Sequence, residues 1–296
     1  DLDGRMPNVE ERIMQAGVRF MNAYVTTPAC CPSRASILTG MYASRHRVTR
    51  NSSTLEQATI VNHLKEAGYY TGLVGKYLNT WDGSPRPEFD YWASFPGGSA
   101  PFYNPVLNVN GKWIDAKGYI TDLFEDCLLE FLARATKQSK PFFLYFAPNA
   151  PHSPATPETS TVEMYNNVGL PKVPSLFESD RSDKPTWLRK IPAFKGGRRK
   201  KLLTFRRNQL RTLWSLDRTI GSLLDQLHIS DLIDQTLIFY ISDNGVFLGE
   251  HGLGSKAAVY EEAVKVPFGV YLKGVFEGGG VNREHLVANI DIAPTI

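Results

Sequence analysis

The chain has 296 residues, of which 42% are hydrophobic and 11% aromatic, a globular composition that allows one large domain or two small ones. Its net charge of +3 gives no whole-protein reason to expect a nucleic-acid partner, and no apolar run approaches the roughly 18 residues that a membrane span needs. Three cysteines, two of them adjacent, do not make a disulfide framework.

Apolar segments with strand and helix periodicity alternate along the chain. Residues 120–135 carry apolar side chains at helical spacing, and Cys127 belongs to this stripe as an expected core residue. Residues 141–147 form a continuous apolar run, typical of a strand that is buried on both faces of a parallel sheet. The alternation predicts an α/β fold with a largely parallel sheet flanked by helices. The expected strands are 17–25, 70–74, 141–147, 236–241 and 266–272, and the expected helices are 32–38, 54–67, 120–135 and 202–227.

Residues that could carry chemistry follow the predicted strands. Lys76, His152 and the pair Asp243–Asn244 each come after a strand, and Cys30 lies in the loop after the strand at 17–25. Because ligands gather at the carboxyl ends of the strands in open α/β sheets, we expect these four spots to converge. Each also has an ordinary explanation: a surface lysine, an exposed loop histidine, an Asn-Gly turn or a buried cysteine.

Cys30 lies at the start of a predicted helix, because Pro32 suits a first turn and Gly40 can end the helix in the left-handed conformation. Unpaired N–H groups and the helix dipole favour negative charge at this point, and Arg34 can lean back towards it. A cysteine in this setting is acidified and reactive. A capped helix with two buried cysteines, Cys30 and Cys31, is the alternative.

The string that begins at Cys30, Cys-Cys-Pro-Ser-Arg-Ala-Ser-Ile-Leu-Thr-Gly, resembles the sulfatase signature. In that family the first cysteine of Cys-x-Pro-x-Arg is oxidised to formylglycine, so the resemblance gives this role to Cys30 and makes Arg34 a catalytic neighbour. Ser-Asp-Asn-Gly resembles the second half of the family's calcium site, which implies Ca²⁺ ligands at Asp243, Asn244 and oxidised Cys30. Asp1 corresponds to the second carboxylate of the family's Asp-Asp pair.

Four further residues match the family's sulfate pocket. His152, in Pro-His-Ser-Pro, matches a histidine that touches sulfate or the leaving oxygen, and with Lys256 it is expected to protonate the leaving alcohol. Lys76 and Lys256 match the two sulfate-binding lysines. The sequence Gly-Lys-Tyr-Leu-Asn around Lys76 is similar to that of members that act on glucosamine 6-sulfates, which makes Asn79 an expected substrate contact.

Two more histidines are candidates for substrate binding. His46 follows the cysteine helix, where the family often has a histidine or arginine that orients the formylglycine; a helix-end residue near the dipole is the alternative. His251, in Leu-Gly-Glu-His-Gly, is expected near the same pocket.

The resemblance covers nearly the whole chain and implies an alkaline phosphatase-like sulfatase core. Residues 1–296 are expected to form one catalytic domain that is truncated at both ends, without the family's opening strand and smaller C-terminal subdomain. The implied activity is hydrolysis of O-sulfate esters in sulfated sugars such as N-acetylglucosamine 6-sulfate or glycosaminoglycans. The implied maturation partner is a formylglycine-generating enzyme, and the implied location is extracytoplasmic: secreted, periplasmic or lysosomal.

Other functions stay open on the sequence. The chain could hydrolyse phosphomonoesters or phosphonates with the same metal site, or bind sulfated glycans without catalysis. Residues 195–207 carry seven basic side chains, which we interpret as a solvated helix face rather than a grip on a polyanion. The irregular stretch 154–197 is a candidate substrate-facing insertion, and Asn51-Ser52-Ser53 matches a glycosylation sequon.

Overall fold

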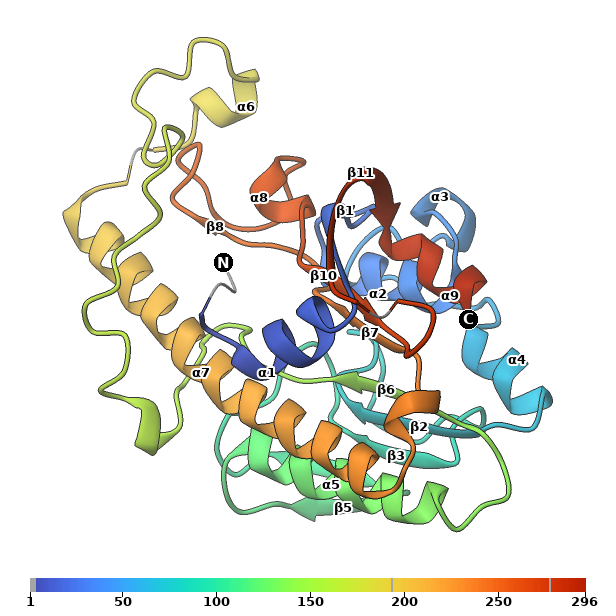
Figure 1. The fold of residues 1–296 in the computed structure, drawn as a ribbon. Coiled ribbons are helices and arrows are strands. Elements are labelled where there is room, and N and C mark those ends of the chain that lie inside the picture. The colour runs from blue at the N-terminus through green and yellow to red at the C-terminus, as the bar shows by residue number, and fades with distance from the viewer. Residues whose placement is uncertain (1–3, 193, 277) are drawn as a thin grey trace.

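Helices surround two large β-sheets in the computed structural model, which describes residues 4–192, 194–276 and 278–296 (Figure 1). The strands are β1 (Val18–Tyr24), β2 (Tyr70–Gly75), β3 (Tyr91–Ser94), β4 (Val106–Val109), β5 (Lys112–Asp115), β6 (Phe142–Ala147), β7 (Ile238–Ile241), β8 (Phe247–Leu248), β9 (Gly254–Ser255), β10 (Phe268–Tyr271) and β11 (Gly280–Ala288). The α-helices are α1 (Pro7–Val9), α2 (Cys30–Thr39), α3 (Ala43–His46), α4 (Ile60–Glu66), α5 (Ile120–Ala135), α6 (Thr186–Arg189), α7 (Gly196–Ile229), α8 (Glu261–Val264) and α9 (Ile292–Thr295). A π-helix, η1 (Glu10–Gln15), and the 3₁₀ turns η2 (Thr159–Thr161), η3 (Ile233–Gln235) and η4 (Asn289–Asp291) complete the described elements.

Both large sheets are mixed, and β8 pairs with β9 in a separate antiparallel hairpin. The first has the order β11-β1-β10-β7, in which β1 runs parallel to β11, while β10 runs antiparallel to both of its neighbours. The second has the order β5-β4-β3-β2-β6 and is parallel across β3, β2 and β6, with antiparallel pairing at β4 and β5. The predicted α/β fold with flanking helices is confirmed, and the parallel arrangement holds in the part of the second sheet that carries the predicted strands.

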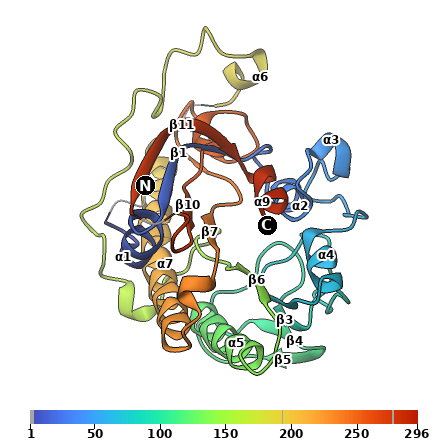
Figure 2. The same ribbon diagram turned by 45° about the vertical axis from the view of Figure 1, so that its right-hand side comes forward.

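The two sheets meet through side chains of β6 and β7, which form an edge of each (Figure 2). On one face Phe146 of β6 and Tyr240 of β7 join the same hydrophobic cluster, and on the other face Tyr145 lies in a cluster with Phe239. Successive side chains of a strand point to opposite faces, so one hydrophobic cluster packs on each face of the contact between β6 and β7. The carboxyl ends of these two strands therefore open on the same region.

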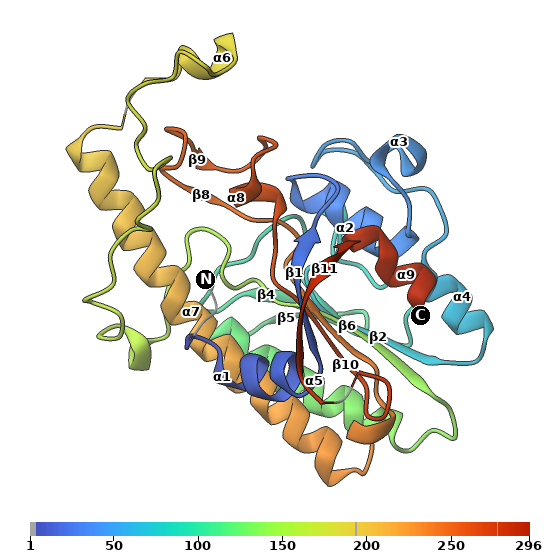
Figure 3. The same cartoon turned by 45° about the horizontal axis from the view of Figure 1, so that its top comes forward.

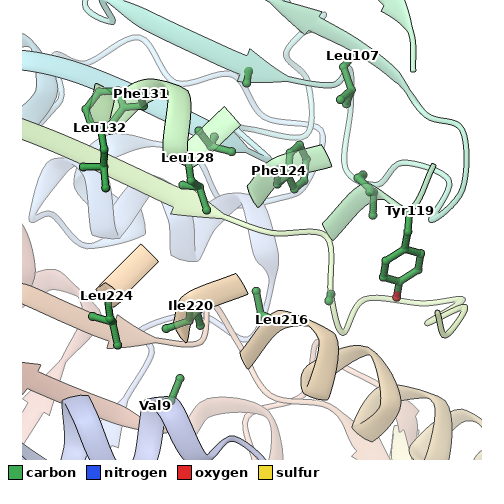
Figure 4. Close-up of a cluster of buried hydrophobic side chains, with 14 of the residues drawn as sticks. Val9, Leu107, Tyr119, Phe124, Leu128, Phe131, Leu132, Leu216, Ile220 and Leu224 are labelled. Carbon is green, nitrogen blue, oxygen red and sulfur yellow. The ribbon is translucent and has the colours of Figure 1, made fainter. Parts of the chain in front are cut away.

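The largest hydrophobic cluster lies between α5, α7 and the second sheet (Figure 4). Phe124, Leu128 and Phe131 of α5 belong to this cluster together with Leu216 and Ile220 of α7. The helix predicted at 120–135 is confirmed with those bounds, because its apolar side chains recur at the period of the helix and bury one face. Cys127 packs against this cluster, as expected.

Two helices begin at other residues than predicted. The helix expected from residue 54 starts at Ile60, because the side chains of Thr59 and Asn62 form a capping box around its first turn. Helix α7 starts at Gly196 rather than at residue 202, so most of the basic run lies in its first turns. The stretch 154–197 is mainly irregular and follows the outer side of α7, with carbonyl oxygens of Met164 and Val168 accepting hydrogen bonds from arginines of that helix.

Candidate active site

Helix α2 presents Cys30 at its first residue and is buried along most of its length. Gly40 ends it with a φ of 65°, the left-handed conformation that glycine adopts without strain. Because α2 packs between the second sheet and α9, its residues are buried on several sides and show little amphipathic pattern (Figure 3). The predicted helix is confirmed, and its first turn lies where the carboxyl ends of the strands converge.

Two asparagines hold the loop that leads into α2. Asn289, fully buried, donates from Nδ2 to Ser33 Oγ at 2.9 Å and accepts from the backbone N–H of Thr26 at 3.0 Å. Asn51 accepts from the backbone N–H of Cys31 at 3.0 Å. These contacts satisfy polar groups at the helix start and fix the direction in which Cys30 points. Sequence periodicity carries no signal for them, since each joins residues that are far apart in the chain.

Lys256 reaches Cys30 from the segment after β9. Its Nζ lies 2.5 Å from Cys30 Sγ and 3.3 Å from Asn244 Oδ1. The residues on either side, Ser255 and Ala257, have φ values of 92° and 78°, which cost of order 1–3 kcal/mol each in non-glycine residues. This strained backbone aims the lysine at the cysteine.

Arg34 ties three segments together. Its Nη1 lies 3.3 Å from Asp243 Oδ2, its Nε donates to the carbonyl of Tyr77 at 2.7 Å, and its Nη2 donates to the carbonyl of Lys76. The guanidinium also lies over the ring of Tyr145, 5.4 Å from its centroid. Arg34 is only 5% exposed, and its hydrogen bonds go to neighbours of Cys30 rather than to the thiol itself. Although burial opposes it, the charge of Cys30 helps to raise the pKa of Arg34. Arg34 acts as a positioning residue that fixes Asp243 and the Lys76 loop.

Lys76 is buried, which excludes the surface-lysine explanation. It follows Gly75, whose φ of 107° and close approach to the backbone of Ala147 require glycine, and its own N–H donates to the Ala147 carbonyl at 2.7 Å. Burial and the neighbouring charge of Arg34 lower the pKa of Lys76, although Cys30 and Asp243 oppose this. The ammonium group therefore belongs to the same electrostatic cluster as Cys30.

His152 faces Cys30 from the loop after β6. Its Nδ1 donates to the carbonyl of Ser153 at 2.8 Å, and its side chain hydrogen-bonds the thiol. The loop is anchored by Asn149, whose buried side chain donates to the carbonyl of Ala100 at 3.0 Å. Sequence reasoning missed Asn149, although its place directly before the Pro-His loop could have drawn notice.

The charges around Cys30 outweigh its burial. Burial raises the pKa of the thiol and Asp243 adds to this, but the hydrogen bond with His152 and the charges of Lys76 and Lys256 lower it to about 6. Burial likewise raises the pKa of Asp243, while Arg34 and both lysines hold it below its usual range. The site therefore keeps an ionised carboxylate and an acidic nucleophile among three cations.

His46 does not reach the site. It is fully buried, its Nε2 lies 3.0 Å from Ser36 Oγ, and its Nδ1 accepts from the N–H of Val48 at 3.1 Å. With both ring nitrogens occupied, His46 supports the far end of α2, and the expectation that it contacts substrate is wrong. The alternative, a helix-end residue, fits.

Within the described residues, neither His251 nor Asn79 forms a hydrogen bond with Cys30. His251 lies between two carboxylates, with Nδ1 3.3 Å from Glu178 and Nε2 3.3 Å from Glu262, and it stacks on the ring of Tyr260. Within the described parts of the chain, Asn79 Oδ1 is buried without a hydrogen-bond partner.

The described residues offer two hard oxygen donors for a cation, Asp243 Oδ and Asn244 Oδ1. Both follow β7, and oxygen donors of this kind suit Ca²⁺. Asp1, the third expected ligand, lies outside the described residues. Within residues 4–192, 194–276 and 278–296 no group of three or more His, Cys, Asp and Glu side chains gathers at a metal-binding distance. The donor set therefore fits the expected metal in chemistry and supplies part of its coordination.

Comparison with known proteins gives one consistent family. The sulfatase family model matches residues 2–296. The chain is 33% identical to the extracellular sulfatase SULF-1 homolog of Drosophila melanogaster and 32% identical to the N-acetylglucosamine-6-sulfatase of Homo sapiens. These matches cover 98% and 96% of this chain but 27% and 55% of those relatives, so the chain spans about half of their length or less.

Similarity to a solved structure supports the same family. A protein solved in complex with its substrate D-glucosamine-2-N,6-O-disulfate superposes with a TM-score of 0.83 at 28% identity, covering 98% of this chain and 70% of that one. Within the described residues no helix is long and apolar enough to cross a membrane. The chain therefore belongs to the sulfatase family.

Proposed function

We propose that this chain hydrolyses O-sulfate esters of sulfated sugars. The observation that carries the proposal is the setting of Cys30: the nucleophile position lies at a helix start, with Lys256 Nζ 2.5 Å away and with Lys76, His152 and Asp243 around it. A nucleophile among preorganised cations suits attack on an ester whose central group is anionic.

Each side chain has a role that follows from its contacts. Lys76 and Lys256 neutralise the sulfate oxygens as negative charge shifts during attack. His152, oriented by its bond to the Ser153 carbonyl, holds the proton that the leaving alcohol takes up. Asp243, kept ionised by Arg34, accepts the proton that the nucleophile gives up.

The two expected groups fit these residues. When present, formylglycine at position 30 supplies a hydrated aldehyde in place of the thiol, and Ca²⁺ supplies positive charge beside it. Asp243 and Asn244 would hold the calcium ion together with Asp1. Arg34 fixes Asp243 through its bond to Oδ2, which keeps the carboxylate turned towards position 30.

The proposed substrate is a glucosamine 6-sulfate unit. Relatives named N-acetylglucosamine-6-sulfatase and the glucosamine disulfate in the solved complex support this choice. We assign Asn79 to a polar contact with the sugar, since its side-chain oxygen is unpaired in the described structure. A formylglycine-generating enzyme as maturation partner and an extracytoplasmic location belong to the same proposal.

The test is turnover of 4-methylumbelliferyl sulfate against 4-methylumbelliferyl phosphate, followed by sulfate release from N-acetylglucosamine 6-sulfate. We expect turnover of the aryl sulfate and sulfate release from the sugar. Preference for the phosphate would instead favour the phosphomonoester or phosphonate hydrolase. A matured chain that binds sulfated sugars and turns over neither ester would favour the non-catalytic glycan-binding protein.

A further inference from the structure

The first turns of α7 carry a concentrated positive charge. We define the α7 basic patch as the exposed cations Lys195, Arg198, Arg199, Lys200 and Lys201. Residues 195–207 contain no acidic side chain, and the patch carries more positive charge than the net +3 of the whole chain. None of these five side chains forms an ion pair with a carboxylate of the described residues.

This arrangement is unfavourable for the helix itself. The positive end of the helix dipole disfavours cations in the first turn, and like charges three or four positions apart, such as Arg198 and Lys201, repel each other. A stable helix start normally carries acidic residues, and α7 has none in its first turn. Local choices that conflict with the fold are expected where a residue serves a function. An anion bound outside the protein would relieve both costs.

Two of the cations are held in place rather than solvated freely. The guanidinium of Arg198 lies 4.3 Å from the centroid of the Phe194 ring, and that of Arg199 lies 4.2 Å from the centroid of Phe177. Arg199 Nε also donates to the Phe194 carbonyl at 3.3 Å. Side chains fixed in this way lose less conformational entropy when they bind a ligand. The structure thus argues against our interpretation of the run as a merely solvated face.

Phe177 and Phe194 also connect the patch to the hairpin formed by β8 and β9. The backbone N–H of Phe177 donates to the carbonyl of Gly249 at 2.9 Å, and a Cβ added to Gly254 would lie 3.2 Å from the Phe194 ring. Gly254 belongs to β9, two residues before Lys256. In Figures 1 and 3 the start of α7 lies on the side of the molecule that carries the β8–β9 hairpin. The patch is therefore in contact, through these two rings, with the hairpin that leads to Lys256.

The chemistry of the patch favours a sulfated polysaccharide over a nucleic acid. Proteins that bind single-stranded nucleic acids combine cations with open aromatic faces on which bases stack. Here the faces of Phe177 and Phe194 are covered by guanidinium groups. Guanidinium and ammonium groups without an accessible ring suit sulfate groups spaced along a flexible anionic chain.

We propose that the α7 basic patch is a second binding site for sulfated polysaccharide, which holds one part of a polymer while the Cys30 site acts on another. This inference rests on the proposed sulfatase function for its substrate class. It predicts that the chain prefers polymeric or oligomeric substrates to isolated sugars.

The binding experiment uses the full chain with Cys30→Ala, so that no turnover interferes. Fluorescence anisotropy measures its affinity for a labelled heparin octasaccharide as salt is varied. The patch variant carries Arg198→Gln, Arg199→Gln, Lys200→Gln and Lys201→Gln. A matched control removes the same charge from exposed lysines outside α7. It carries Lys112→Gln, Lys117→Gln, Lys137→Gln and Lys140→Gln.

We expect the patch variant to bind about 30-fold more weakly than the parent, from four exposed ion pairs of ordinary strength. The slope of log affinity against log salt should fall by about one for each lost contact. Its melting temperature should change little, because relief of repulsion at the helix start offsets the lost contacts of Arg198 and Arg199 with the two phenylalanine rings. Equal loss in the patch and control variants, or equally tight binding of a single-stranded DNA of matched charge, would overturn the proposal.

Turnover separates this inference from the proposed function. In the matured chain with Cys30 intact, the patch substitutions should leave hydrolysis of 4-methylumbelliferyl sulfate unchanged and raise the KM for a sulfated oligosaccharide several-fold. If neither form hydrolyses the aryl sulfate while the binding difference persists, the sulfatase function fails and the binding site stands. If the aryl sulfate is hydrolysed and the KM for the oligosaccharide is unchanged, the second binding site fails alone.

Discussion

At the scale of single residues, the balance between burial and neighbouring charges sets the pKa of the Cys30 thiol. Cys30 is almost fully buried, which by itself would keep a thiol protonated, yet its neighbours lower its pKa to about 6. The other two cysteines behave in the opposite way: burial raises the pKa of Cys31 and brings that of Cys127 to about 11. Position 30 is thus electrostatically distinct even without modification.

The unmodified chain allows a direct titration of this difference. With calcium chelated, the thiolate absorbance at 240 nm should rise around pH 6, with the thiol protonated below and ionised above that value. Replacing Lys256 with Met removes a cation beside the sulfur and should move the midpoint upwards. Cys30→Ser should abolish the step. A first ionisation above pH 8 in the parent would show that the cationic cluster does not act on Cys30 as described.

Oxidation to formylglycine should occur at Cys30 and not at Cys31. In active protein, the tryptic peptide that ends at Arg34 should contain formylglycine in place of Cys30 and an intact, alkylatable Cys31. Mass spectrometry detects the lighter residue, and a hydrazide probe confirms the aldehyde. Cys31 serves as the internal control, because both residues lie in the same peptide. Full activity with Cys30 entirely as a thiol would remove the proposed mechanism.

Asp243 provides a test of metal binding that does not depend on activity. Calcium at 100 times its dissociation constant should stabilise the full chain by about 2.7 kcal/mol. Asp243→Asn keeps a hydrogen-bond acceptor for Arg34 but removes the charge, so most of this stabilisation should disappear. Thermal unfolding with and without calcium measures the difference. The same calcium shift in both proteins would exclude Asp243 as a ligand.

At the scale of elements, α2 depends on contacts from distant segments. The buried Asn289 of η4 joins the helix start at Ser33 to the loop residue Thr26, two partners that the sequence keeps more than 250 positions away. The first turn of α2 therefore has little freedom to move, and the direction of Cys30 is fixed by the C-terminal part of the chain. An element that is formed locally is oriented by residues that are remote in sequence.

Removing the Asn289 side chain should lower the free energy of unfolding. Asn289→Ala leaves buried polar partners unsatisfied, which costs about 1–3 kcal/mol. Urea unfolding should show this loss, and the kcat for the aryl sulfate should fall as the helix start loosens. Asn167→Ala, at an exposed asparagine, is the control and should change neither quantity. Unchanged stability in the Asn289 variant would mean that another contact holds the loop.

At the scale of the whole molecule, the packing of helices against the two large sheets positions the carboxyl ends of the strands. The separation between α5 and the second sheet is set by close packing, since Gly72 of β2 lies directly against the ring of Phe131. An added methyl group there would contact that ring at less than a van der Waals distance. The large cluster around α5 and α7 thereby controls the position of β2, which ends at Gly75 next to Lys76.

Gly72→Ala should therefore destabilise the fold by about 1–3 kcal/mol through overpacking. Combining it with Phe131→Leu should recover part of the loss, because the smaller side chain makes room for the methyl group. A double-mutant cycle in urea measures the coupling between the two positions. Additive losses would indicate that the helix and strand do not press on each other at this point.

Elements with local causes could be predicted from the amino-acid sequence alone. The spacing of apolar residues defined α5, Pro32 and Gly40 bracketed α2, and the string from Cys30 identified the family before any contact was known. Periodicity, capping residues and turn residues act within a few positions, so they are readable along the chain.

The way in which these elements form one site depends on contacts between distant residues, which the sequence does not reveal. In the folded chain Arg34 forms an ion pair with Asp243, and His46 is buried beside Ser36. Lys256 contacts Cys30, although 226 positions of sequence separate the two residues. The fold also gives β10 antiparallel neighbours, which an apolar run cannot reveal. Pairing partners, side-chain direction and the balance of burial with charge depend on residues that meet only when the chain folds, and these long-range contacts made a cluster of separate motifs into a candidate active site.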